Sequence, residues 1–191
     1  NEGVRAEPTT ILEIKDKNDK TIYKHDVEKK PVMPESVAYI ISSILSDTRA
    51  RAETFGNALN ISRTAAVKTG TTNDYKDALT IGYTPSLVVG VWVGNNDNKP
   101  MSRIAGSLGA APIWRLLMER FLSGTERESF RRPLGIVSES ICKDKGLNTN
   151  VATSSAYTEY FIAGTLPTKD CSLPDVSPST SPTPGETETP T

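Results

Sequence analysis

The sequence is poor in the residue types that build metal centres. Its 191 residues include one histidine, His25, and two cysteines, Cys142 and Cys171. Zinc and similar ions are usually held by clusters of His and Cys at short, regular spacings, and no such cluster occurs here. His25 stands in a charged stretch, which indicates a solvated side chain rather than a catalytic base. We therefore predict no metal site and no cofactor.

The sequence also lacks a strong charge of either sign and a long apolar run. Its formal net charge is -1 and its Lys and Arg residues are scattered, so no basic stripe for nucleic acid is expected. No stretch reaches the roughly 18 apolar residues that span a bilayer, and no signal-peptide pattern opens the chain. The composition, 36% hydrophobic and 24% charged, is typical of a globular domain. Because the chain starts at Asn1 without an initiator Met, we expect a piece of a longer protein.

Two cysteines are enough for one disulfide, but spacing alone does not show that Cys142 and Cys171 meet. The alternative of two unpaired thiols stays open. From Ser172 onward Ser, Thr, Pro and Glu dominate. Such a segment cannot bury enough apolar surface to offset the cost of ordering, so residues 172–191 are predicted to be a disordered tail.

The first sixty residues predict a hairpin, a helix and a loop. Thr9–Ile14 and Thr21–Lys24 are strand-like and flank a turn-like segment, which favours a β-hairpin. Pro34 and Glu35 mark a helix start, and apolar residues recur at helical spacing up to about Asp47. The polar stretch Arg49–Asn60 is predicted to be a loop.

The middle of the chain predicts three consecutive strands followed by a helix. The strands are expected at 64–69, 78–83 and 87–93, as an antiparallel meander, and the third is apolar enough for burial on both faces. Residues 110–121 carry an apolar helical face that should pack on the sheet, with Pro112 in the first turn. Trp92 and Trp114 lie in apolar segments and are predicted to be core residues.

The segment Lys68-Thr69-Gly70-Thr71 is the chemically suggestive one. It ends a β-prone stretch and is followed by a short loop and another strand, which is the setting of an edge strand with a hairpin partner. On its own, the triplet Lys-Thr-Gly is a weak signal. A lysine on an edge strand can simply be a solvated residue that discourages sheet-to-sheet association.

The surrounding residues make the triplet specific. The chain resembles the class A, or bifunctional, penicillin-binding proteins over nearly everything before the tail, and the Lys-Thr-Gly strand is a motif of that family. The resemblance is carried by VKTGTTNDYKDA at 67–78, GYTPSLVVGVWVG at 82–94, GVR at 3–5 with EPT at 7–9, AAPIW at 110–114, and YTEYF at 157–161 with GT at 164–165.

The resemblance implies roles for the four motif residues in acyl transfer through a serine. Lys68 would supply a cation to the substrate carboxylate, and Thr69 and Thr71 would offer it hydroxyls. The backbone N–H of Thr71 would form half of an oxyanion hole. Gly70 lets a substrate backbone lie close to the strand. The ligands implied are D-Ala-D-Ala stem peptides of peptidoglycan and β-lactams.

The resemblance also implies an architecture. We expect an α/β (α+β) fold, an antiparallel sheet with covering helices, that forms the C-terminal portion of a transpeptidase domain. Residues 1–124 would belong to that domain, 125–171 to a C-terminal extension in which Cys142 and Cys171 are the candidate disulfide pair, and 172–191 to the tail. The remainder of the domain would be the chain's partner. The parent would be anchored on the extracytoplasmic face of the membrane and would carry a glycosyltransferase domain.

The sequence departs from the family pattern in one important respect. The family places a Ser-x-x-Lys nucleophile motif and then a Ser-x-Asn motif before Lys-Thr-Gly, and neither occurs upstream of Lys68. Ser140 and Lys143 have the nucleophile spacing but lie downstream, so we interpret them as a coincidence. Leu79 and Asn95–Asp97 are milder departures. A related serine β-lactamase or carboxypeptidase and a noncatalytic wall-binding module remain alternatives.

Overall fold

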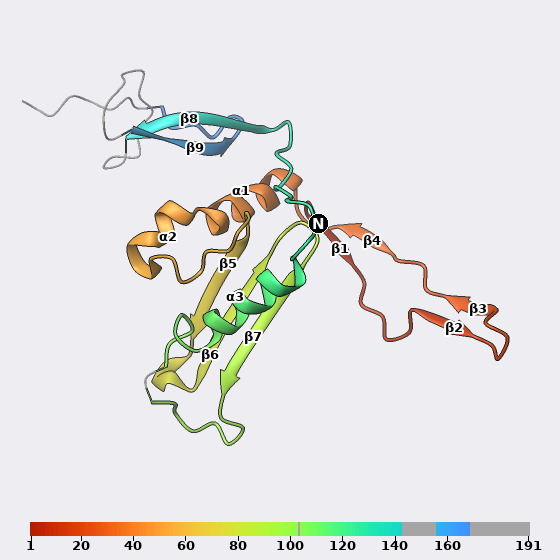
Figure 1. The fold of residues 1–191 in the computed structure, drawn as a ribbon. Coiled ribbons are helices and arrows are strands. Elements are labelled where there is room, and N and C mark those ends of the chain that lie inside the picture. Colours follow the sequence, from red (N-terminus) through yellow and green to blue (C-terminus); the bar gives the residue numbers. More distant parts are fainter. Residues whose placement is uncertain (103, 143–155, 169–191) are drawn as a thin grey trace, which may run out of the picture. The chain divides into compact units, whose positions relative to one another are not determined.

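The computed structural model describes residues 1–102, 104–142 and 156–168. It is a mixed α and β structure with small antiparallel sheets and helices, so the predicted fold class is confirmed (Figure 1). Contacts divide the chain into two units. The first comprises 1–137 and 160–164. Among the described residues, the second comprises 138–142, 156–159 and 165–168.

The N-terminal strands form two short ribbons of the first unit. β1 (Val4–Ala6) pairs with β4 (Lys29–Pro31), and β2 (Glu13–Lys15) pairs with β3 (Thr21–Lys24). The turn between β2 and β3 is fixed by Asp16, whose Oδ1 accepts from the backbone N–H groups of Asn18 and Lys20. The predicted hairpin is therefore present, but its first strand starts at Glu13 instead of at Thr9.

Two helices follow the ribbons. The predicted helix is confirmed as α1 (Glu35–Ser46), which begins directly after Pro34. The loop predicted over Arg49–Asn60 is wrong in its first part, because α2 occupies Thr48–Phe55. Asp47 caps α2, since its side chain accepts from the N–H groups of Arg49 and Ala50. A side-chain cap thus starts a helix that has no apolar face for the sequence to reveal.

The predicted meander is confirmed as a three-stranded antiparallel sheet in the order β5-β6-β7. Its strands are β5 (Ala66–Thr71), β6 (Asp77–Tyr83) and β7 (Val88–Gly94), and a short 3-10 helix, η1 (Asn73–Tyr75), lies between the first two. The prediction that β7 is buried on both faces is wrong. Alternate residues of β7 are exposed, because α3 contacts only one face of the strand.

The core of this unit lies between the sheet and α3 (Ala110–Phe121), which packs on the sheet as predicted (Figure 1). Trp114 is fully buried, as expected, and its ring lies over Gly82, where a Cβ atom would come within 2.3 Å of it. The core cluster comprises Leu59, Ala65, Val67, Ala111, Trp114, Met118 and Leu122.

The last described strands, β8 (Ile136–Cys142) and β9 (Ala156–Ile162), pair with each other. Cys142 is buried at the end of β8 and is disulfide-bonded. Its predicted partner, Cys171, lies outside the described residues, so their pairing stays a prediction. Lys143 and the tail 172–191 also lie outside the described residues.

Candidate functional site

The Lys-Thr-Gly segment lies at one margin of the three-stranded sheet. Lys68, Thr69, Gly70 and Thr71 are the last four residues of β5, which pairs only with β6 in the part of the chain that the structure describes. Lys68 and Thr71 are exposed, and Thr69 and Gly70 are half-buried. The segment is therefore open to a ligand that approaches the edge of the sheet.

Strand alternation separates the motif side chains onto two faces of the sheet. Side chains of successive strand residues point to opposite faces. Val67 packs in the core with Trp114, so Thr69 and Thr71 share that face, which we call the α3 face. Lys68 and Gly70 belong to the other, the lysine face.

Backbone groups alternate as well, and this alternation fixes which of them face the open edge. The N–H of Thr72 donates to the carbonyl oxygen of Asp77, 3.1 Å away, and so points inward to β6. In an antiparallel pair the preceding residue directs its backbone groups the other way. The N–H of Thr71 therefore points to the open edge of the sheet. The same applies to Thr69, whose carbonyl oxygen accepts from Lys68 Nζ at 2.7 Å.

On the α3 face, Gly106 holds the end of β5 against the start of α3. Its N–H donates to Thr71 Oγ1 at 3.0 Å, and its carbonyl oxygen accepts from Thr80 Oγ1 at 3.3 Å. The Thr71 hydroxyl is thus an acceptor inside the protein, and a hydroxyl that accepts in this way can still donate its own proton to another group.

On the lysine face, three side chains form a hydrogen-bonded link across all three strands. Thr72 Oγ1 donates to Asp77 Oδ2 at 2.8 Å, and the indole N–H of Trp92 donates to Asp77 Oδ1 at 2.8 Å. The bond from Trp92, followed by that from Thr72, holds the pKa of the Asp77 carboxyl below its usual range. Asp77 is therefore ionised at neutral pH. We call these three residues the Asp77 clamp.

The chain is similar to proteins of known family and structure. The family described as penicillin-binding protein 1A, C-terminal domain, matches residues 132–175. Penicillin-binding protein 2D of Bacillus subtilis is 29% identical over 180 residues, 90% of this chain and 26% of that protein. The crystal structure of penicillin-binding protein 1A from Haemophilus influenzae matches with a TM-score of 0.73 at 24% identity, over 88% of this chain and 31% of that one. Over nearly its whole length the chain is similar to the C-terminal part of class A penicillin-binding proteins.

A second solved structure has a more distant likeness. Penicillin-binding protein A from M. tuberculosis, in its imipenem acyl-enzyme complex, matches with a TM-score of 0.50 at 22% identity, over 64% of this chain and 28% of that one. The chain spans about a quarter of the length of the curated relatives it matches first. It corresponds to the C-terminal part of class A penicillin-binding proteins and has the fold of a transpeptidase domain.

Several residues around the motif were not predicted from the sequence. Trp92 was predicted to be core, but it is 49% exposed and its indole N–H is used by Asp77. No role was predicted for Gly106 from the sequence. No pattern pointed to Asp77, because its bonds depend on which residues face each other across strands. Thr72 adjoins the motif, and only that adjacency could have indicated it.

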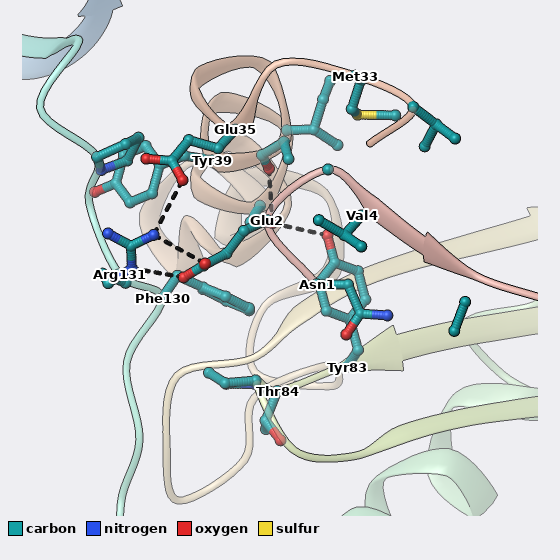
Figure 2. Close-up of a pocket in the computed structure, with 18 of the residues that line it drawn as sticks. Asn1, Glu2, Val4, Met33, Glu35, Tyr39, Tyr83, Thr84, Phe130 and Arg131 are labelled. Carbon is teal, nitrogen blue, oxygen red and sulfur yellow. Dashed lines mark hydrogen bonds and ion pairs between the residues drawn. The ribbon is translucent and has the colours of Figure 1, made fainter. Parts of the chain in front are cut away.

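The cavity drawn in Figure 2 lies elsewhere in the first unit. It measures about 830 Å3 and lies between the N-terminal segment, α1, the turn after β6 and residues 129–133 (Figure 2). Residues 68–71 do not line it. Lys29 and Arg131 are among its lining residues. Arg131 is bound by two carboxylates, to Glu2 Oε1 at 2.7 Å and to Glu35 Oε2 at 3.0 Å, and the bond to Arg131 lowers the pKa of Glu2. The positive charge of Arg131 is therefore balanced by these two carboxylates, and the cavity does not offer this charge to an anionic ligand.

Within the described ranges, no helix is long and apolar enough to cross a membrane. The same residues bring no group of three His, Cys, Asp or Glu side chains together in a way that could hold a metal ion.

Proposed function

We propose that β5 is the carboxylate-binding and oxyanion-binding strand of a penicillin-binding D,D-transpeptidase that cross-links peptidoglycan. The observation that carries this proposal is the open edge of β5, where Lys68 is exposed and the N–H of Thr71 points outward. The similarity to class A penicillin-binding proteins supports it.

The proposed reaction is acyl transfer through a serine that this chain does not supply. The serine oxygen attacks the carbonyl carbon between the two D-Ala residues, and its proton passes through a base to the departing D-Ala amine. The resulting ester is then attacked by an amine of a second stem peptide, which releases the serine. With a β-lactam, the ring amide opens instead and the product stays on the serine. The imipenem acyl-enzyme of penicillin-binding protein A from M. tuberculosis is a covalent complex of this kind in a protein of similar fold.

Each motif residue has its own proposed role, which depends on its charge or on the direction of its hydrogen-bond donor. The Lys68 ammonium group pairs with the ligand carboxylate and lies on the same strand as the oxyanion donor. The Thr71 N–H donates to the oxygen that becomes negative during attack, and such donors contribute most when they are held in place beforehand. Gly70 adds no side chain between Lys68 and Thr72 on the lysine face, so the ligand backbone can lie against the strand. Thr69 offers its hydroxyl to the ligand carboxylate.

The wider assignment follows from the same family. The parent would be a membrane-anchored enzyme on the extracytoplasmic face, with a glycosyltransferase domain ahead of the transpeptidase domain and the remainder of that domain as this chain's partner. We divide the chain into transpeptidase residues 1–124, a C-terminal extension 125–171 and the tail 172–191. The family match over 132–175 supports a separate extension.

The test compares this chain with the full-length protein that carries it. We expect fluorescent penicillin to label the full-length protein covalently and not the chain alone, since no Ser-x-x-Lys precedes Lys68. Lys68→Ala in the full-length protein should slow labelling roughly ten- to hundredfold, the usual effect of losing a hydrogen bond to a charged group. Rates of labelling are read from fluorescence in denaturing gels.

The matched control is Lys24→Ala, which removes an exposed strand lysine from β3. It should leave labelling unchanged. An unlabelled full-length protein would overturn the proposal and favour a noncatalytic wall-binding module. Labelling of the isolated chain at Ser140 would show that our interpretation of Ser140 is wrong. Rapid turnover of the penicillin ester would favour a serine β-lactamase.

A further inference from the structure

The turn that follows β5 has an unfavourable backbone conformation. Asp74 and Tyr75 have positive φ angles of 60° and 55°, which residues with a side chain adopt rarely. The turn starts directly after Thr71, whose N–H is the proposed oxyanion donor. A turn of this kind keeps its shape only if the contacts around it over-determine it.

Thr72 and Asp77 supply those contacts at the two ends of the turn. The N–H of Thr72 donates to the Asp77 carbonyl oxygen at 3.1 Å, and the N–H of Asp77 donates to Thr72 Oγ1 at 2.8 Å. Thr72 Oγ1 in turn donates to Asp77 Oδ2. The N–H of Tyr75 also donates to the Thr72 carbonyl oxygen, at 3.2 Å. The Thr72 side chain therefore replaces a backbone acceptor at the end of the β5-β6 ladder.

Trp92 fixes the other oxygen of the same carboxylate. Asp77 faces Gly94 across β6 and β7, so Trp92 is its diagonal neighbour. A Cβ atom at Gly94 would lie only 2.6 Å from Trp92 Cζ2. The missing side chain at Gly94 thus makes room for the indole ring to reach Asp77. Both carboxylate oxygens of Asp77 are consequently held, one by β7 and one by the end of β5.

We propose that Asp77, together with Thr72 and Trp92, is a positioning residue that holds the Thr71 N–H in the direction needed by the oxyanion. This inference rests on the proposed function. The Asp77 clamp acts through the backbone, since Thr72 is covalently joined to Thr71, and it does not itself touch the ligand. It should therefore affect the acylation step and leave the first, noncovalent binding of penicillin largely unchanged.

The experiment separates these two steps in the full-length protein. Stopped-flow measurements with fluorescent penicillin give the Kd of the noncovalent complex and the rate constant of acylation. Thr72→Val removes the hydroxyl at constant shape and should lower the acylation rate constant about tenfold, less than the loss of an oxyanion donor, because the N–H is misdirected rather than absent. The Kd should change by less than about twofold, since the charge of Lys68 is kept.

Three further variants guard against a merely structural effect. Thr72→Ser restores the hydroxyl and should restore the acylation rate constant. Trp92→Phe keeps a ring over Gly94 but loses the N–H, and should lower the rate constant by a smaller factor, about threefold. If Thr72→Val does not fold, the acylation rate constant of Trp92→Phe tests the positioning role instead. Asp97→Asn is the matched control, because it removes a charge just after β7 whose carboxylate pairs with Lys99 and takes no part in the Asp77 clamp.

The outcomes distinguish the two proposals. If the unaltered protein is acylated and Lys68→Ala slows it, but Thr72→Val and Trp92→Phe react at the normal rate, the clamp has no positioning role and the proposed function stands. A lowered melting temperature with an unchanged acylation rate constant, or an equal effect of Asp97→Asn, also overturns the positioning role. If the unaltered protein is not acylated at all, both proposals are wrong.

Discussion

Gly106 sets the position of the candidate site without having a side chain. Its N–H and carbonyl oxygen bond Thr71 and Thr80, and the carbonyl oxygen also accepts from the first N–H groups of α3. A Cβ atom here would lie 2.4 Å from the carbonyl oxygen of Gly70 and 2.6 Å from that of Leu79. Both neighbours are backbone atoms, so a side chain could be admitted only if β5 and β6 moved.

We predict that Gly106→Ala lowers the free energy of unfolding by about 1–3 kcal/mol, the usual cost of overpacking a well-packed site. Urea denaturation followed by circular dichroism measures it. Gly90→Ala is the control, because a Cβ atom there would meet only Ile81 Cγ1, at an ordinary 3.6 Å. Equal stability of Gly106→Ala and the unaltered chain would contradict the close approach.

At the same scale, the place of the motif residues on an edge strand was easier to predict from the sequence than the residues that contact the end of that strand. Lys68 to Thr71 form a contiguous motif, so their place on an edge strand could be read from the pattern and the resemblance. Asp77 and Trp92 are 15 positions apart in the sequence and meet only through a diagonal pairing of β6 and β7. Such a contact depends on strand register, which the sequence pattern specifies by face and not by individual partner.

At the scale of elements, periodicity predicted α1, α3 and the meander, because each has an apolar face that packs on a neighbour. β7 was misread since a run of apolar residues resembles a strand buried on both sides. Only its residues toward α3, such as Val89 and Val91, pack against the core. α2 was missed for the opposite reason: it has no buried residue, and its start depends on the Asp47 cap.

We predict that Asp47→Ala lowers the free energy of unfolding by about 0.5–2 kcal/mol, because two N–H groups at the start of α2 lose their acceptor. The loss should be accompanied by a small decrease in helical circular dichroism at neutral pH. Asp47→Ser keeps an oxygen at the cap and should recover most of the stability. If Asp47→Ser is as destabilising as Asp47→Ala, the cap is not what stabilises α2.

At the scale of the whole molecule, the lysine face of the sheet is notable for its exposed apolar side chains. Ile81 is 53% exposed, Val88 66% and Trp92 49%. Nothing in the described part of the chain pairs with the second edge of β7. Open apolar edges and patches of this kind usually mark a surface that another segment covers. In the proposed parent, we expect the remainder of the transpeptidase domain to cover it.

The chain alone should therefore be only marginally stable and should bind a hydrophobic fluorescent dye, whereas the full-length protein should not bind the dye at this face. Replacing Ile81 and Val88 with Thr keeps β-branched residues on the strands while removing apolar surface from contact with water. The double variant should bind less dye than the unaltered chain and melt at a similar or higher temperature, because both side chains are more than half exposed to water. A cooperative melt of the unaltered chain at high temperature, without dye binding, would show that this face is stable in water and needs no cover.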